Sequence, residues 1–267
     1  MIIMAHTVYD NFVLENKLED LLTTAVDMNA YATHDASLTE TAGMKKTIHT
    51  YTATGDVEDL NMGEGNTDEI TVSFTSKDYT VGVTQGKFAY YDEQEMKDPM
   101  VVDAGLTGLS QKMTNDLTEK IVAELAKGTQ TITVAPTFDG IVDAIAKYPY
   151  ESEEGLFLLI NKAEKATLRK NLGEDLKYSE GFARTGYIGT VCGVPVIVTD
   201  AVPAGTMYLA TKEAVTIFTK KGSETEQERD ADHRKNTVYA RKVMLVALTD
   251  ATKVVKITVN NTKATTE

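Results

Sequence analysis

The chain has 267 residues, of which 42% are hydrophobic and 25% are charged, so it can build a sizeable core in one or two domains. Its apolar runs are far shorter than the about 20 residues of a membrane span, and it begins without a secretory signal, so we expect no membrane partner and assembly in a cytoplasm. The formal charge of −13 argues against a specific reader of nucleic acid, although the chain could lie near packaged DNA without gripping it.

The first predicted element is an amphipathic helix over residues 10–28. Apolar residues recur there at helical spacing, with charged residues between them: Leu14, Leu18, Leu21, Leu22, Ala25 and Val26. The apolar stripe is narrow, and polar residues follow from Thr33 to Thr41. This pattern indicates a short arm that docks on another surface, rather than a core helix.

A long β-hairpin is predicted between about Met44 and Tyr91. Two runs alternate apolar and polar residues with the period of a strand: Ile70, Val72 and Phe74, then Tyr79, Val81 and Val83. The stretch from Gly55 to Glu69 between the strands contains three glycines and six acidic residues, which is typical of a solvated tip. Because an isolated hairpin is marginally stable, it needs another surface. This is the first indication of an assembly protein.

The strongest helical pattern follows the hairpin. Asp98 is a cap residue and Pro99 suits the first helical position, while Gly128 ends the helix. The apolar residues repeat at steps of three and four: Leu106, Leu109, Met113, Leu117, Ile121 and Leu125. A helix of this length extends about 40 Å. Gly105 and Gly108 weaken its first turns, so the helix is predicted to be a spine with some freedom to bend there.

Short strands and helices alternate in the second half of the chain. The unbroken apolar run at residues 156–160 is typical of a strand buried on both faces, and Asn161 caps the helix that follows. Charges crowd between Glu224 and Lys235, which predicts a charged loop. The other expected strands lie at 131–134, 190–198 around a turn at 193–195, 206–209, 215–219, 237–248 and 254–259, with helices at 138–148 and 161–172.

This order of elements resembles the tailed-phage capsid fold of the Hong Kong 97 type, which encapsulins and the floor of herpesvirus capsids share. Three stretches carry the resemblance: Leu156-Phe-Leu-Leu-Ile-Asn161 with its helix, Tyr187 to Asp200 followed by Val202 to Leu209, and Glu224 to Asn236 followed by Val238 to Val246. The resemblance implies an α+β fold with four parts. These are an N-terminal arm (1–41), an extended hairpin loop (42–97), a peripheral domain with the spine helix (98–139 and 229–267) and an apical α/β domain (140–228).

The resemblance also implies a function. The chain is expected to be a major capsid protein that forms pentamers and hexamers in the icosahedral head of a tailed phage, assembled in the host cytoplasm and located in the virion. Scaffold, portal and decoration proteins are further expected partners, and we expect any scaffold to be a separate polypeptide. The alternatives are an encapsulin-like compartment shell and, from another class, a small soluble enzyme.

Some members of the resembled family join subunits through an isopeptide bond between a tip lysine and an asparagine, with a glutamate as catalyst. Asn236 matches the asparagine position, but the glutamate position falls near Val243 and the tip contains no lysine. An attacking amine must lose a proton to a nearby base. We therefore expect no covalent cross-linking.

Ten charged residues are the candidate contacts between subunits. They belong to the acidic tip and to the charged loop: Asp56, Glu58, Asp59, Glu64, Glu224, Glu226, Arg229, Asp230, Asp232 and Arg234. Asp230, Asp232 and His233 could suggest a metal site, but Arg229 and Lys235 beside them oppose a cation. An ion-pair network between subunits is favoured, and a solvated loop is the alternative.

We predict no catalytic, cofactor or metal site. The four histidines lie in different elements, with no nucleophile elbow near them, and Gly63-Glu-Gly65 lacks the rest of a phosphate loop. Cys192 stands in an apolar run and is interpreted as a small buried hydrophobe rather than a reactive thiol.

Overall fold

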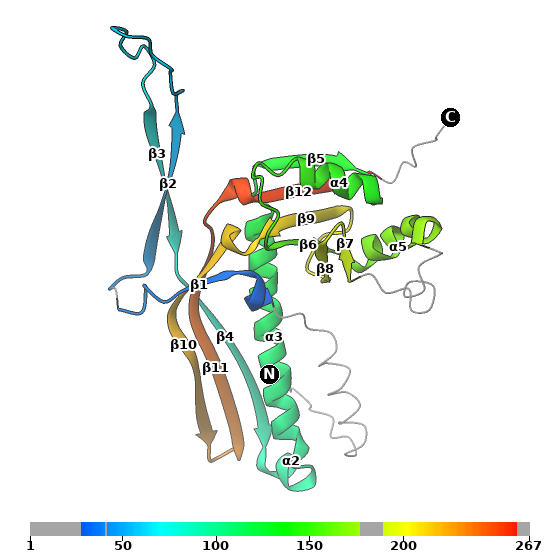
Figure 1. The fold of residues 1–267 in the computed structure, drawn as a ribbon. Coiled ribbons are helices and arrows are strands. Elements are labelled where there is room, and N and C mark those ends of the chain that lie inside the picture. Colours follow the sequence, from blue (N-terminus) through cyan, green and yellow to red (C-terminus); the bar gives the residue numbers. More distant parts are fainter. Residues whose placement is uncertain (1–27, 41, 177–188, 261–267) are drawn as a thin grey trace.

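The computed structural model describes residues 28–40, 42–176 and 189–260. The amphipathic helix expected at 10–28 and most of the polar loop after residue 174 lie outside these ranges. The described chain begins with a short 3-10 helix, η1 (Met28–Tyr31). It then builds two sheets on either side of one long helix, with a separate hairpin that projects from the body (Figure 1).

The predicted spine is the helix α3 (Met100–Leu125), whose 26 residues extend about 39 Å at 1.5 Å per residue. The Asp98 carboxylate accepts a hydrogen bond from the Met100 amide at 3.0 Å, as expected of a cap. Pro99 stands one residue earlier than predicted, at the N-cap. The short helix α2 (Asp92–Lys97) precedes the spine and was not predicted.

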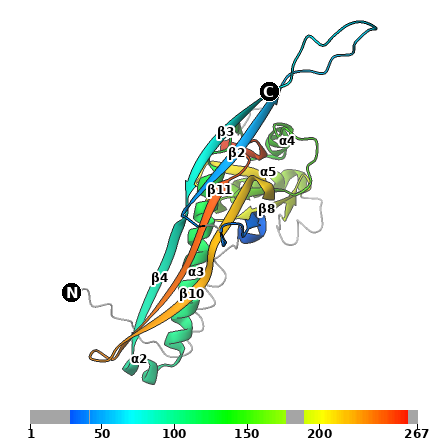
Figure 2. The ribbon, with the colours of Figure 1, turned by 90° about the vertical axis from the view of Figure 1, so that its left-hand side faces the viewer.

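A four-stranded sheet lies along the spine in the order β1-β10-β11-β4 (Figure 2). Its strands are β1 (Thr33–Asp35), β4 (Gly82–Tyr91), β10 (Val215–Asp230) and β11 (Lys235–Leu248). Strand β10 corrects the prediction of a short strand and a charged loop, because the charged residues up to Asp230 continue the strand. Opposite charges face each other across the ladder, since Glu224 pairs with Arg241 and Asp230 with Lys235, and such pairs stabilise an exposed sheet.

Two glycines bring β4 close to the spine. A Cβ atom on Gly105 would stand 2.5 Å from the Phe88 ring, and one on Gly86 would stand 2.3 Å from the Leu109 side chain. Both contacts are shorter than side-chain packing permits. The sequence suggested that Gly105 weakens the helix, whereas the structure gives it a packing role.

The predicted hairpin is confirmed over β2 (Lys45–Thr54) and β3 (Thr71–Thr80), which pair in antiparallel register. It is shorter than expected, because β4 leaves it to pair with β11. Its base is fixed in a small cluster where Tyr79 and Val81 pack with Phe218. Beyond that base it stands away from the body (Figures 1 and 2).

The six-stranded sheet has the order β5-β12-β9-β6-β8-β7. Its strands are β5 (Gln130–Val134), β6 (Leu156–Ile160), β7 (Thr190–Val191), β8 (Val194–Val198), β9 (Thr206–Thr211) and β12 (Val254–Val259). The helices α4 (Phe138–Ala146) and α5 (Lys162–Leu176) accompany it. As predicted, β6 is buried throughout, and Asn161 accepts a hydrogen bond from the Ala163 amide at 3.0 Å.

The turn between β7 and β8 lies earlier than predicted. Cys192 and Gly193 form it with φ angles of 51° and 79°, the two positive values that a tight hairpin turn requires. Pro195 lies within β8 and pairs with Thr190. Gly193 therefore has the expected conformational role, whereas the proline belongs to the strand.

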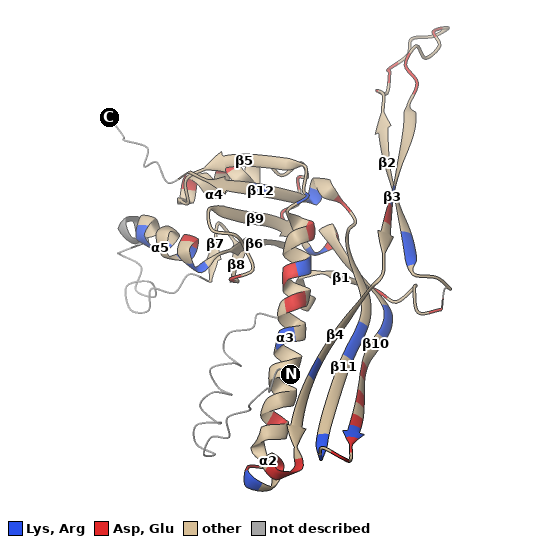
Figure 3. Ribbon diagram, turned by 180° about the vertical axis from the view of Figure 1, so that it is seen from behind, with Lys and Arg blue, Asp and Glu red and all other residues tan. Residues whose placement is uncertain are grey.

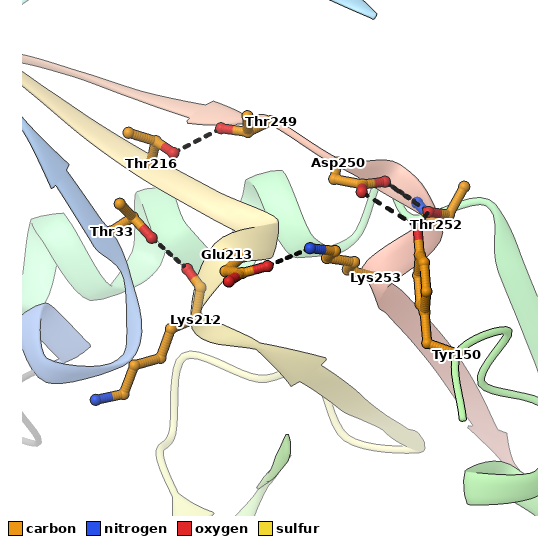
Figure 4. Close-up of polar contacts among 9 residues, drawn as sticks. All are labelled: Thr33, Tyr150, Lys212, Glu213, Thr216, Thr249, Asp250, Thr252 and Lys253. Carbon is orange, nitrogen blue, oxygen red and sulfur yellow. Dashed lines mark hydrogen bonds and ion pairs between the residues drawn. The ribbon is translucent and has the colours of Figure 1, made fainter. Parts of the chain in front are cut away.

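Two short 3-10 helices join the sheets, η2 (Lys212–Ala214) between β9 and β10 and η3 (Ala251–Lys253) between β11 and β12. Figure 4 shows their polar contacts: Lys253 forms an ion pair with Glu213, and the Thr249 hydroxyl donates to Thr216 at 2.7 Å. The Tyr150 hydroxyl lies 2.9 Å from that of Thr252. The two connecting segments are thus joined to each other by side chains, at the place where the chain passes between the sheets.

Candidate assembly surfaces

The outer half of the hairpin has one apolar face and one hydroxyl face. Residues paired across the ladder lie on the same face, and the register pairs Tyr51 with Phe74 and Ala53 with Val72. The opposite face carries only hydroxyl side chains: Thr50, Thr52, Thr54, Thr71, Ser73 and Thr75. Tyr51 and Phe74 are each 73% exposed and Val72 is 51% exposed. Contiguous exposed apolar residues of this kind mark an interaction surface, and we call this set the hairpin apolar face.

The inner half of the hairpin is polar on the same side. Lys45 forms an ion pair with Asp78, whose carboxylate also accepts a hydrogen bond from the Thr47 hydroxyl at 2.6 Å. These contacts lower the pKa of Asp78, with the hydrogen bond from Lys45 as the main cause. Next along the strand, His49 lies 2.8 Å from the Ser76 hydroxyl. The apolar face is therefore confined to the part of the hairpin farthest from the body.

The acidic tip is exposed, and much of its charge organises the loop itself. Glu58 accepts hydrogen bonds from the amide of Thr67, at 2.8 Å, and from its hydroxyl, which lower the pKa of Glu58. Glu64 accepts from the Asn61 amide at 3.1 Å. Asp56 and Asp59 are exposed. The tip also presents apolar side chains that the sequence analysis passed over: Val57, Leu60 and Met62.

The far end of the long sheet carries a network centred on Asp92 in α2. Its carboxylate accepts hydrogen bonds from Arg229 at 2.8 Å and from Asn236 at 2.7 Å, and its amide donates to the Arg234 carbonyl at 3.0 Å. Arg234 also lies 3.0 Å from Glu93. Two of the predicted charged residues, Arg229 and Arg234, are therefore brought together here, and they tie α2 to the β10–β11 turn.

Other predicted residues pair within the same long sheet, where residues of both charges occur along β10 and β11 (Figure 3). Arg241 bonds Glu224 at 2.7 Å and Glu226 at 3.0 Å. Hydrogen bonds lower the pKa of Glu224; the bond from Lys221 is the main cause and the bond from Arg241 is the next. Asp230 accepts hydrogen bonds from the backbone amide of His233 at 3.3 Å and from its ring at 2.8 Å. These bonds, with the backbone one as the main cause, lower the pKa of Asp230. Asp232 is exposed in the turn.

We predict that the subunit loses stability in acid because of these pairs. The pKa values of Glu224 and Asp230 are lowered from 4.5 and 3.8 in the folded chain, so both groups stabilise it above those values and cease to do so as pH falls through the lowered ones. The midpoint temperature of thermal unfolding should decrease as the pH is lowered from about 5 to about 3, the range in which carboxyl groups titrate. The midpoint temperature of the Glu224→Gln variant should decrease less steeply over this range. Equal slopes for the variant and the unaltered protein would contradict the assignment.

Three features of the described residues bear on other kinds of function: metal ligands, the cysteine and the apolar length of the helices. Within ranges 28–40, 42–176 and 189–260, no three histidine, cysteine or carboxylate side chains gather as a metal site. Cys192 is half-buried, and desolvation raises the pKa of its thiol, which disfavours the reactive thiolate. No helix in that part of the chain is long and apolar enough to cross a bilayer.

Comparison with known proteins decides the family. The family model described as phage capsid protein matches residues 74–257, well over half of the chain. The chain belongs to this family. Capsid proteins are structural subunits rather than enzymes, which agrees with the prediction from the sequence. The matched range includes the spine, every strand from β4 to β11, most of β3 and most of β12.

Individual relatives agree with the family. The chain is 29% identical over 153 residues to the major capsid protein of Staphylococcus phage phiMR11, an alignment of 56% of this chain and 55% of the relative, so the match spans about half of that protein. Among solved structures, the capsid of a native GTA particle gives a TM-score of 0.69 at 10% identity, covering 97% of this chain and 94% of the other. The capsid of cyanophage P-SCSP1u gives 0.67 at 10% identity, with coverage of 98% and 93%. These structures share the fold.

The hairpin apolar face is the surface that sequence reasoning missed. Alternation at Val72 and Phe74 was recognised, but it predicts only that one face is apolar, and such faces are usually buried in their own sheet. The pairing register and the projection of the hairpin are needed to see that this face is uncovered. The exposed apolar tip residues Val57 and Met62 were hidden among acidic neighbours.

Proposed function

We propose that this chain is a major capsid protein, a structural subunit that self-assembles as pentamers and hexamers into the icosahedral head of a tailed phage. Its place is the virion, after assembly in the host cytoplasm. The family match carries the proposal, and the hairpin apolar face supplies its physical basis. An apolar face that the body of its own subunit does not cover requires a partner, and in a closed homo-oligomer that partner is another copy.

The hairpin is proposed to overlap the adjacent subunit through Tyr51, Phe74 and Val72. The acidic tip, with Asp56, Glu58, Asp59 and Glu64, would reach a second surface of that neighbour. The charged residues of the long sheet already pair within the chain, so their contribution between subunits would be an exchange or extension of these pairs. Exposed pairs are individually weak, whereas buried aromatic side chains dominate interface energy. The hairpin apolar face is therefore proposed to contribute most of the binding energy between subunits.

We also propose that the chain has the four parts of the Hong Kong 97-type fold: arm, extended hairpin loop, peripheral domain and apical domain. Sheet membership favours revised boundaries. Strand β4 and all of β10 belong with the spine in the peripheral part, while β5 and β12 belong with the apical sheet. The domain boundary would then pass through the η2–η3 junction rather than through residues 139 and 228.

An encapsulin-like shell is the second candidate. It is favoured by the fold of the virus-like particle from Pyrococcus furiosus, whose TM-score is 0.58 at 13% identity, with 92% of this chain and 98% of the other covered. The two candidates differ in content, since a phage head holds a genome and a compartment holds protein cargo. Scaffold, portal and decoration proteins are proposed partners only of the phage head, and packaged DNA would be held without sequence-specific contacts.

Electron microscopy of the purified chain, with assay of the particle content, tests this function. Closed shells tens of nanometres across are expected, with DNA inside particles taken from infected cells. Particles filled with an enzyme and free of DNA would favour the compartment. A chain that stays monomeric at all concentrations would overturn both.

We also predict that the shells contain no covalent links. Val243 pairs with Val83 where the resembled family has its catalytic glutamate, and Asn236 is buried with its amide donating to Asp92. Neither the base nor a tip lysine is available for amide exchange. Boiled particles should run as a single monomer band on a denaturing gel. A ladder of oligomers that survives boiling and reductant would contradict this.

A further inference from the structure

An apolar groove runs between the spine and the long sheet. Apolar side chains from α3 and β11 line it: Leu106, Leu109, Met113, Leu117, Ala240 and Met244. Polar side chains from α3, β10 and β11 line it as well: Ser110, Thr114, Ser223, Thr225 and Lys242. Leu106 is exposed. A groove with apolar and polar side chains in its lining is the kind of surface that receives an amphipathic helix.

The described chain begins beside one end of this groove. Met28 is fully buried and belongs with Leu117 to one hydrophobic cluster, while Asn29 lines the groove itself. The residues that precede Met28 therefore start at the Leu117 end. Because α3 runs towards this end and the described chain begins there, a helix that lay along the groove and ended before Met28 would be parallel to the spine.

We propose that residues 14–26 of the same chain occupy this groove as an amphipathic helix. Two parallel helices rise by the same distance per residue, about 1.5 Å. Residues that lie the same number of positions before Asn29 in the arm and before Leu117 in α3 are therefore neighbours. The pairs obtained in this way match apolar arm residues to the facing row of the spine: Leu18 with Leu106, Leu21 with Leu109, Leu22 with Ser110, and Ala25 with Met113. The spacing of the arm stripe is thus the spacing of the groove.

Charge and connectivity favour the arm of the same chain. Residues 10–28 contain five acidic residues and one lysine, and Lys242 is the charged residue of the groove lining. A segment joined directly to the groove is present there at high effective concentration, an advantage that a neighbour's arm lacks. The surface on which the arm was expected to dock would then belong to the same chain, and the hairpin would remain the segment that other subunits cover.

A disulfide pair tests the placement. In a Cys192→Ala background, Leu22→Cys is combined with Ser110→Cys, and the protein is oxidised mildly as assembled particles and as free subunits. Disulfides form where Cα atoms come within about 4.4–6.8 Å. The expected product, in most chains, is an internally linked monomer that migrates faster on a non-reducing gel and reverts with reductant. Leu18→Cys with Leu106→Cys should behave in the same way.

The matched control places the second cysteine on an exposed position of α3 outside the groove, as Leu22→Cys with Glu119→Cys, and should give no link. Covalent dimers from the groove pair would show that a neighbour's arm occupies the groove, and absence of any link would show that the arm lies elsewhere. Both results overturn the proposal. Free subunits should form the same internal disulfide, so this test does not depend on shell assembly. Assembly is followed separately by microscopy.

Discussion

Replacing Tyr51 and Phe74 with serine is expected to abolish shell formation while leaving the subunit folded. The two residues pair across the hairpin and are each 73% exposed in the isolated chain, so the loss of their rings changes the subunit's own stability by only about 1 kcal/mol or less. At an interface, truncating a central aromatic residue costs about 2 kcal/mol or more. That loss recurs at every copy of the contact. Sedimentation and microscopy should find free subunits or capsomers at concentrations where the unaltered chain forms shells.

The hydroxyl face provides the control for this experiment. Thr50 and Thr75 pair with each other on the opposite side of the same hairpin, and replacing both with serine makes two substitutions to serine at neighbouring positions of the same strands without removing an aromatic ring. This variant should assemble normally. Normal shells from the Tyr51/Phe74 variant would show that the apolar face is not the contact. Failure of both variants would indicate a general defect of the hairpin rather than a loss at one face.

Phe157→Ala is expected to produce the largest loss of subunit stability. Phe157 is 2% exposed in β6, and its ring centroid lies 5.2 Å from that of Tyr31. The residue belongs to the cluster that joins the spine, both sheets and η1. Removing a buried phenylalanine costs about 3–5 kcal/mol through lost burial and the cavity left behind, a large part of the about 5–15 kcal/mol that stabilises a typical domain. Urea unfolding of unassembled subunits measures the change.

Phe138→Ala is the matched control, because it is the same substitution at a site 47% exposed. Its cost should be about 0.5 kcal/mol or less, as at ordinary surface positions. Similar midpoints for the two variants would contradict the assignment of Phe157 to the core. A loss confined to Phe157→Ala would show that the junction of the two sheets and the spine is the stable centre of the subunit.

Local patterns predicted the elements that depend on local chemistry. The buried strand β6, the Asn161 cap, the last strand β12 and the glycine- and acid-rich hairpin tip all follow from residue type and period. The spine was predictable for the same reason, since its apolar residues repeat over many turns. An element whose formation depends only on its own residues can therefore be predicted from one sequence.

Elements that depend on distant partners were misjudged. Glu224 to Asp230 looked like a loop because charged residues rarely signal a strand, and only pairing with Arg241 and Lys235 makes that extension of β10 favourable. Strand β4 was assigned to the hairpin because its partner β11 lies about 150 residues away in sequence. The hairpin apolar face was overlooked for a related reason, since exposure depends on where the whole ribbon points.

Oxidative footprinting of Tyr51 and Phe74 tests the account most directly. Both side chains should be modified readily in dissociated subunits and strongly protected in closed shells, because a neighbouring copy then covers them. Equal modification of the two rings in shells and in subunits would mean that no neighbour covers this face, and the proposed basis of assembly would be wrong.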